Sequence, residues 1–366
     1  KAAVDQNGFI AALDDEFWSD QGAYVRTHAA TVPELTASML PGPYVIPAYR
    51  SVGHIRLTNK TPAGTYRAPG RFEGTFVRER LMDEIARQIG RDPTDVRRIN
   101  LISADAMPFN RQLDAIGTEV VYDSGVYESL LDELLEYVNY ASLRSEISSR
   151  KLKGESVGLG IAYFVEKSGL GPFDDVRLEL YEDGLLEVIT GTASVGQGVE
   201  TILTQICADA LGIAFENIKV VHGQTDRIRR GMGAFASRVS VMTGSAVHIA
   251  AEKLRERILE AFREISGVEA CSLVVEGGVV RLSSGSSLSM SFAQIVQRAP
   301  VEFLETGSKG NCLVVRSEFN TSHMTYPYGI HLVVARVDRG LASVTLERMV
   351  VAYDVGRSIN PLLVEG

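Results

Sequence analysis

Three glycine-rich stretches of the sequence run into segments with helical periodicity, and they contain the side chains best suited to hold a ligand. The stretches are TPAGTYRAPGRFEGTF, GTASVGQGVETILTQI and HGQTDRIRRGMGAFASRVSVMTGSA. Glycines that lead into a helix N-terminus let backbone N–H groups approach an anion, and the helix dipole favours negative charge there. Between Gly196 and Gly198, the amide of Gln197 can donate to an oxo or phosphate oxygen. Ser237 and Arg238 would add a hydroxyl and a permanent positive charge at the start of a long helix.

Each of these features also has a purely structural interpretation, which the sequence leaves open. A Gly-Gln-Gly triplet is common in tight turns, and Ser237 could simply cap the helix that follows it. Arg67 and Arg71 could be surface or ion-paired side chains. The sequence has neither the P-loop pattern GxxxxGK followed by Ser or Thr nor the GxGxxG dinucleotide fingerprint, and its histidines lack metal-ligand spacing.

Length, composition and charge bound the class of protein. With 366 residues, 45% hydrophobic and 23% charged, the chain favours a globular protein of two domains. A net charge of −9 with interspersed basic residues argues against a nucleic-acid partner. No apolar run approaches the roughly 18–20 residues needed to cross a bilayer. The given sequence does not open on a signal-peptide pattern, and Cys207, Cys271 and Cys312 are far apart, so we expect buried thiols in a cytoplasmic protein.

The hydrophobic periodicity predicts an α+β fold in which hairpins alternate with helices. Hairpins are expected at Asp183-Gly184, at Gly277-Gly278 and around 338–340. Helices are expected over 75–90, from Asp92 onwards, and over 127–151, 198–211 and 237–265. The stretch 148–155 separates a long helix from a new strand run. We therefore expect two intimately packed domains, 1–150 and 151–366, with mixed or antiparallel sheets and flanking helices.

Taken together, several stretches resemble the molybdopterin-binding region of molybdenum hydroxylase large subunits, the family of xanthine dehydrogenase, aldehyde oxidase and aerobic carbon monoxide dehydrogenase. The matching stretches are DQGAY, GPYVIPAYR, TYRAPGR with RERLMDEIARQIGRDPTDVRRINLI, GTASVGQGVETILTQICADALGI, VVHGQTDRIRRGMGAFASR and VVAYDVGRSINPLLVEG. They occur in family order and cover essentially the whole chain. The resemblance implies that 1–150 and 151–366 are two molybdopterin-binding domains, the first lacking its N-terminal and the second its C-terminal part.

The resemblance also implies roles for individual residues. Gly196-Gln197-Gly198 looks like the loop that contacts the oxo ligand of the molybdenum centre and the pterin. Arg67 matches the arginine of the active-site loop beside the metal. Phe235-Ala236-Ser237-Arg238 resembles the segment that lies along the pterin dithiolene and its phosphate. Because the dithiolene sulfurs hold the metal in this family, the resemblance implies no direct protein ligand to molybdenum.

The general base of the family is a glutamate that would lie beyond Gly366, so we expect no catalytic residue within this chain. The resemblance implies a longer oxidoreductase that hydroxylates a carbon with oxygen from water and passes electrons through 2Fe–2S clusters to FAD. No iron–sulfur or flavin motif occurs here, so those centres are expected on partner subunits or other domains, within a dimer of heterotrimers. The cofactor is expected in its cytosine dinucleotide form. The 366-residue chain alone is expected to be inactive and to lack cofactor.

Departures from the family pattern narrow the substrate. Carbon monoxide oxidisers carry a cysteine where this chain has Ala68, and purine oxidisers place an aromatic residue where it has Pro69. Purine oxidisers also carry a pocket arginine shortly before the IPAYR-type segment, and this chain has none there. These departures disfavour carbon monoxide and purines and leave an aldehyde or another heterocycle. Two alternatives remain: a non-catalytic molybdopterin carrier, or a structural assembly module. One molybdenum per chain in the intact protein would exclude the assembly module.

The sequence generates a prediction that separates a ligand loop from an ordinary turn. In the full-length enzyme, Gln197→Ala should change the free energy of unfolding by no more than about 0.5 kcal/mol, because a loop glutamine buries little apolar area. It should nevertheless lower turnover strongly, since a donor aimed at developing charge in a dry site can contribute about 3–4 kcal/mol. Gly198→Val should instead impair cofactor retention. Turnover per bound molybdenum and thermal midpoints test both variants, and an unchanged rate in Gln197→Ala would make the loop an ordinary turn.

Overall fold

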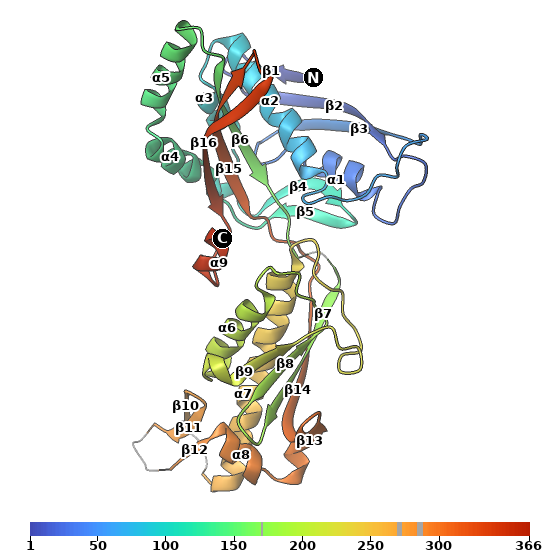
Figure 1. Cartoon of the computed structure of the whole chain (residues 1–366), viewed down its shortest axis with the longest axis vertical. Coiled ribbons are helices and arrows are strands. Elements are labelled where there is room, and N and C mark those ends of the chain that lie inside the picture. Colours follow the sequence, from blue (N-terminus) through green and yellow to red (C-terminus); the bar gives the residue numbers. More distant parts are fainter. Residues whose placement is uncertain (170, 269–272, 284–287) are drawn as a thin grey trace. The chain divides into compact units, whose positions relative to one another are not determined.

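The computed structural model describes residues 1–169, 171–268, 273–283 and 288–366. These residues form two compact units that interleave along the sequence: Lys1–Lys167 with His323–Gly356, and Ser168–Ser322 with Arg357–Gly366, called unit 1 and unit 2 below. Each unit combines helices with mixed or antiparallel sheets, which confirms the α+β class (Figure 1). The family domains 1–150 and 151–366 stay a prediction.

Unit 1 is built from small sheets and five helices among its described residues. One sheet contains β1 (Ala2–Val4), β2 (Ile10–Asp20) and β3 (Ala48–Arg56), with β2 and β3 parallel. A hairpin joins β4 (Phe109–Ala115) to β5 (Thr118–Tyr122), and an antiparallel sheet contains β6 (Val157–Val165), β15 (Tyr328–Asp338) and β16 (Ser343–Asp354). The helices are α1 (Thr31–Met39), α2 (Arg71–Ile89), α3 (Pro93–Asn100), α4 (Tyr127–Tyr137) and α5 (Tyr140–Leu152).

The helix ends of unit 1 follow local residue chemistry. Gly90 ends α2 in the left-handed conformation, with φ of 68°. The Asp92 side chain then accepts a hydrogen bond from the Thr94 amide at 2.8 Å and caps α3, as the sequence predicts. The prediction of one helix over 127–151 is wrong, because Asn139 has φ of 49° and separates α4 from α5. Asparagine tolerates this left-handed conformation, which a continuous helix does not allow.

A buried ion-pair network ties α2 and α3 to strand β6. The Arg97 side chain is fully buried, and its guanidinium donates to Glu79 Oε2 at 2.9 Å and to the Ile161 carbonyl at 2.8 Å. Arg78 donates to Glu79 Oε1 at 2.8 Å and to the Tyr163 carbonyl at 2.6 Å. Ile161 and Tyr163 belong to β6, whose single partner strand among the described residues is β15. The two arginines therefore satisfy backbone carbonyls at the open edge of this sheet.

Unit 2 contains a five-stranded mixed sheet, ordered β13-β14-β7-β8-β9. Its strands are β7 (Phe173–Tyr181), β8 (Leu186–Thr190), β9 (Ile218–Val221), β13 (Leu304–Gly307) and β14 (Gly310–Asn320). A smaller sheet contains β10 (Leu273–Glu276), β11 (Val279–Leu282) and β12 (Ser289–Ser291). The helices are α6 (Val199–Leu211), α7 (Gly244–Ser266), α8 (Phe292–Arg298) and α9 (Pro361–Glu365).

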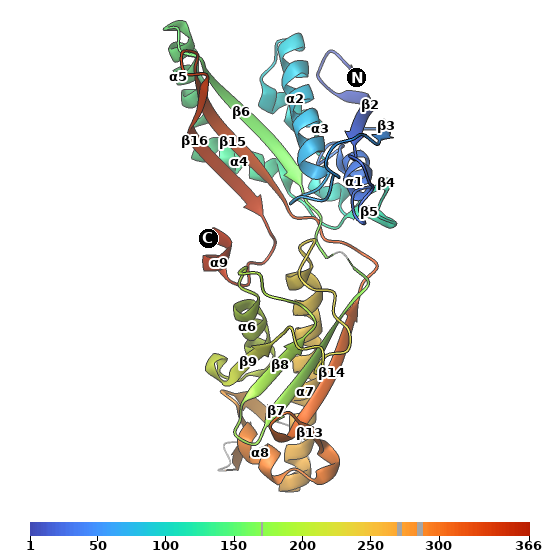
Figure 2. The ribbon, with the colours of Figure 1, turned by 45° about the vertical axis from the view of Figure 1, so that its right-hand side comes forward.

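The core of unit 2 lies between the large sheet and its helices. Buried side chains of β7 and β8, such as Leu178 and Val188, pack with Leu203 of α6 and with Leu254 and Phe262 of α7. Figures 1 and 2 show α6 and α7 on the same side of this sheet. Side chains along a strand point alternately to the two faces of the sheet, so every second residue of β7 faces the helices. This alternation explains why apolar residues recur at every second position there.

The three predicted hairpins are confirmed: β7–β8 turns at Asp183-Gly184, β10–β11 at Gly277-Gly278, and β15–β16 after Asp338. The predicted long helix over 237–265 differs at its start, where Val239–Thr243 is a π-helix before α7 begins. Cys207 and Cys312 are buried, and burial raises the pKa of each thiol, to about 12 and about 11. Cys271 lies outside the described residues. Within the described ranges, no helix is long and apolar enough to cross a membrane.

We predict that Glu79→Gln lowers the free energy of unfolding by about 3–5 kcal/mol, because it removes the carboxylate paired with buried Arg78 and leaves buried Arg97 with Asp83 alone. Urea unfolding monitored by circular dichroism would measure the loss. Glu84→Gln is the matched control, since the Glu84 side chain, on the same helix, is 44% exposed and pairs with Arg87. If Glu84→Gln lowered the free energy of unfolding as much as Glu79→Gln, burial of the ion pairs would not explain the loss.

Candidate cofactor site

The loop before α6 leads into a helix start that no side chain caps, and its Gly196 amide donates to Ser194 Oγ at 3.5 Å. Gly198, with φ of 80°, is the N-cap of α6, and no side chain caps the helix. Gly196 has φ of 94°, and no atom lies within 4 Å of where its Cβ would be. The Gln197 side chain accepts from the Val195 amide at 2.7 Å, and both residues are exposed. The loop is therefore open enough for a ligand to reach its amide groups.

The second predicted segment has an unusual backbone. Ala236 and Ser237 both have positive φ, 49° and 52°, and the π-helix follows directly. The N-cap position of the π-helix is Arg238 and no side chain makes a capping hydrogen bond there, so Ser237 does not cap this helix. Two successive non-glycine residues in this conformation cost free energy, of order 1–2 kcal/mol each. Such strain, like a π-helix, concentrates at functional sites in proteins.

Arg238 itself is buried rather than open to a ligand. Its side chain has no exposed surface, and it donates to Asp174 Oδ2 at 3.0 Å and to the Phe173 carbonyl at 2.5 Å. Burial raises the pKa of Asp174, while hydrogen bonds from Thr243 and Arg238 oppose that rise. The Arg238 guanidinium therefore anchors the segment Phe235–Arg238 to β7. A contact between Arg238 and a cofactor phosphate stays a prediction.

The stretches that lead into these two segments touch at a pair of glycines. A Cβ on Gly191 would come within 2.3 Å of Gly231 Cα, and one on Gly231 within 2.4 Å of the Gly191 carbonyl oxygen. The Gly233 amide donates to the same carbonyl at 3.2 Å. Only glycines allow this approach. The structure thus brings the second and third glycine-rich stretches together within unit 2.

The first glycine-rich stretch belongs to unit 1, where its two arginines differ. Arg71 is buried, with Nη2 at 2.6 Å from Glu166 Oε1 and Nη1 donating to the Pro69 carbonyl at 2.7 Å. The ion-paired interpretation therefore holds for Arg71. Arg67 is exposed, and no carboxylate of the described residues forms an ion pair with it. Arg67 is the arginine that remains available to a ligand.

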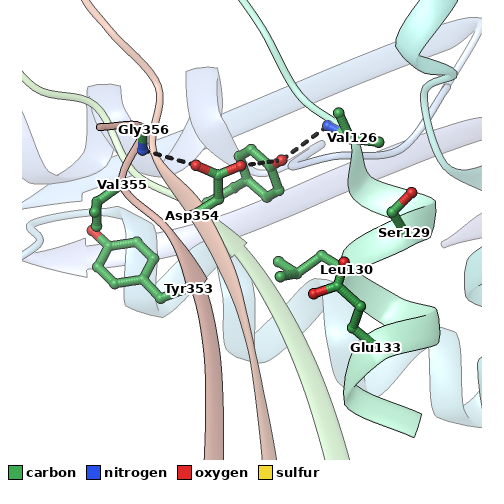
Figure 3. A pocket seen from close by; sticks show the side chains of 9 residues that line it. Val126, Ser129, Leu130, Glu133, Tyr353, Asp354, Val355 and Gly356 are labelled. Atoms are coloured by element: carbon green, nitrogen blue, oxygen red, sulfur yellow. Dashed lines mark hydrogen bonds between the residues drawn. The ribbon is translucent and has the colours of Figure 1, made fainter. Parts of the chain in front are cut away.

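A separate open pocket of about 280 Å³ in unit 1 contains none of the predicted site residues. It lies between α4 and the end of β16 (Figure 3). The Tyr328 hydroxyl donates to Asp354 Oδ2 at 2.7 Å and accepts from the Val126 amide at 2.9 Å. Burial, together with the Asp354 carboxylate, raises the pKa of Tyr328 to about 12. These polar groups satisfy one another and hold the end of β16 against α4.

The donors of unit 2 fit an anionic, organically held cofactor. Uncapped amides at Gly198 and the open space at Gly196 suit phosphate or oxo oxygens. The buried Thr192 hydroxyl, in the same loop, has no hydrogen-bond partner among the described residues. No group of three or more His, Cys, Asp or Glu residues in the described part of the chain could hold a metal ion.

Known proteins resemble this chain over its whole length. Models described as "Molybdopterin cofactor-binding domain" match residues 1–101 and 133–366. The chain is 35% identical to the 6-hydroxypseudooxynicotine dehydrogenase complex subunit gamma of Paenarthrobacter nicotinovorans, covering 100% of this chain and 46% of that protein. It is 30% identical to the nicotine 6-hydroxylase large subunit of the same organism, with the same coverage. The crystal structure of quinoline 2-oxidoreductase from Pseudomonas putida 86 matches with a TM-score of 0.87 at 27% identity, covering 100% of this chain and 48% of that one.

The family models and the relatives thus define a molybdopterin-binding region. The chain belongs to the molybdopterin cofactor-binding domain family, within molybdenum hydroxylase large subunits, and it spans about half the length of the curated relatives it matches.

The sequence did not reveal which residues hold the predicted cofactor-binding segments in place. Asp174 lies 64 residues before Arg238 in the sequence, and Glu166 lies 95 residues after Arg71. Gly191 and Gly231 were visible as glycines, but nothing local shows that their backbones touch. The acidic pair Asp174-Asp175 within an otherwise alternating strand was the one available sequence feature.

We predict that Gly196→Ala impairs cofactor retention in the full-length protein, because its side chain would occupy the open space from which a cofactor approaches the loop. Gly267→Ala is the matched control: Gly267 has φ of 66°, is exposed and also has no neighbour within 4 Å of a Cβ. Both changes should cost about 1–2 kcal/mol of stability from backbone strain. Molybdenum content per chain and thermal midpoints compare them. Equal molybdenum in both variants would remove Gly196 from the site. Gly198 is less suitable, since a Cβ there would lie 2.8 Å from Leu363 Cδ1.

Proposed function

We propose that this chain is the cofactor-binding part of a molybdenum hydroxylase that inserts oxygen from water at a carbon of a heteroaromatic compound or an aldehyde. The observation that carries the proposal is the joining of the two glycine-rich stretches of unit 2 at Gly191 and Gly231, in a chain that both molybdopterin-domain models match. The general base is expected to lie in the remainder of the full-length subunit.

Residues of this chain would bind and orient the cofactor. Amides of Gly196–Gly198 and of Ala236-Ser237 would donate to its anionic oxygens, and the Gln197 side-chain amide would donate to an oxo oxygen. Arg67 would contribute positive charge beside the reacting centre. The bound cofactor, proposed to be in the cytosine dinucleotide form, would supply the two-electron oxidation, while the protein supplies position and hydrogen bonds.

The names of the relatives favour a nitrogen heteroaromatic substrate. Nicotine and quinoline, after which two of these proteins are named, both contain such a ring. Ala68 and Pro69 still disfavour carbon monoxide and purines by the family resemblance. One relative is named as a subunit of a complex. We propose partner subunits that carry 2Fe–2S clusters and FAD and accept the electrons, in a dimer of heterotrimers.

The test uses the full-length subunit with its partners, made in a host that synthesises molybdopterin. We predict about one molybdenum per chain and turnover of a quinoline- or pyridine-type compound with the label of H₂¹⁸O in the product. Arg67→Met should lower turnover per molybdenum by about 10²-fold, in the range of lost electrostatic stabilisers. The control is Arg80→Met, an exposed arginine of α2 paired with Asp83. Bound molybdenum without turnover of heteroaromatics or aldehydes would favour a non-catalytic carrier, and absence of molybdenum would refute the proposal.

A further inference from the structure

The conformation of Phe235–Ser237 needs an external restraint. Ala236 and Ser237 have successive positive φ values, and non-glycine residues persist in this region only where surrounding contacts hold them. The Arg238 amide donates to the Phe235 carbonyl at 3.1 Å, which closes the turn but leaves its orientation undetermined. The contacts that orient the turn must therefore come from the side chains around it.

Arg238 and Thr243 supply these contacts through one carboxylate. Arg238 Nη1 donates to Asp174 Oδ2 at 3.0 Å and to the Gly233 carbonyl at 3.2 Å, and the guanidinium lies 5.5 Å from the centre of the Phe235 ring. The Thr243 hydroxyl, at the end of the π-helix, donates to the same Asp174 oxygen. The side chains of Asp174, Arg238 and Thr243 are removed from solvent. The carboxylate thus ties together both ends of the segment 238–243.

The neighbouring residue shows that this arrangement is specific to Asp174. Side chains alternate along β7, so Asp174 points to the face covered by α7 and Asp175 to the opposite face. Asp175 pairs with Arg230 at 2.9 Å, and the Arg230 side chain is half exposed. Both aspartates contact the same long loop, but only Asp174 is bonded to the residue that follows the strained pair.

We propose that Asp174 is a positioning residue for the cofactor, which holds Phe235-Ala236-Ser237 through Arg238 and Thr243 in the conformation that presents their amides to the cofactor. This inference rests on the proposed function, since it takes the molybdopterin as the ligand of the segment. A segment held before binding loses less conformational entropy when the cofactor binds, so Asp174 contributes to affinity without touching the ligand.

The test compares Asp174→Asn with Asp175→Asn in the full-length subunit. The two changes remove one negative charge from adjacent residues of the same strand. Asp174→Asn should lower the molybdenum and pterin retained per folded chain after dialysis by about ten-fold, a change of about 1.4 kcal/mol in binding. It should also speed amide hydrogen exchange over 236–243 in the cofactor-free protein. Asp175→Asn should leave both measurements near the wild type.

Each outcome decides the proposal. Equal retention and equal exchange in the two variants would overturn it, and so would a lower thermal midpoint for Asp174→Asn with retention unchanged. If Asp174→Asn does not fold, Thr243→Val replaces it, with Thr243→Ser as the variant that restores the hydroxyl donor and should restore retention. A wild-type subunit without molybdenum would refute the proposed function and the cofactor role of Asp174, while unequal exchange in the two variants would still identify Asp174 as the anchor of the segment.

Discussion

Each unit buries an arginine side chain, and the charge of that arginine must be paired within the protein. Arg97 and Arg238 are the largest fully buried side chains of the described residues, and an unpaired buried charge would cost several kcal/mol. Each arginine therefore collects a carboxylate and backbone carbonyls from distant parts of the chain: Glu79 and Ile161 for Arg97, Asp174 and Phe173 for Arg238. The requirement to satisfy these groups selects one arrangement of helices and strands in each unit.

The proposed cofactor loops follow from that arrangement. Once Arg238 is bonded to β7, the turn at Ala236-Ser237 is held at the start of the π-helix and α7. The close backbone approach of Gly191 and Gly231 then brings the stretch before α6 alongside. The result is a set of backbone donors on a rigid scaffold, the form of site that suits a large anionic cofactor whose metal needs no ligand from the protein.

The glycines of the site have two separable purposes. Gly191 and Gly231 let two backbones touch, and their role is visible entirely within the protein. Among the described residues, nothing lies within 4 Å of where a Gly196 Cβ would be, so the loop is open at this position. The proposed cofactor would account for this open loop, since a ligand can occupy space that no side chain fills.

The sequence by itself determined the α+β class, the three hairpins, the capped start of α3 and the family, because turn residues, caps and periodicity are local properties. It also identified which loops carry the candidate donors. It did not show the break at Asn139, the π-helix at Val239–Thr243 or the burial of Arg238, and only the tertiary structure decided these. The burial of Arg238 and the anchoring of the π-helix depend on residues far apart in the chain: Asp174, 64 residues before Arg238, accepts hydrogen bonds from Arg238 and Thr243, and no local pattern encodes such contacts.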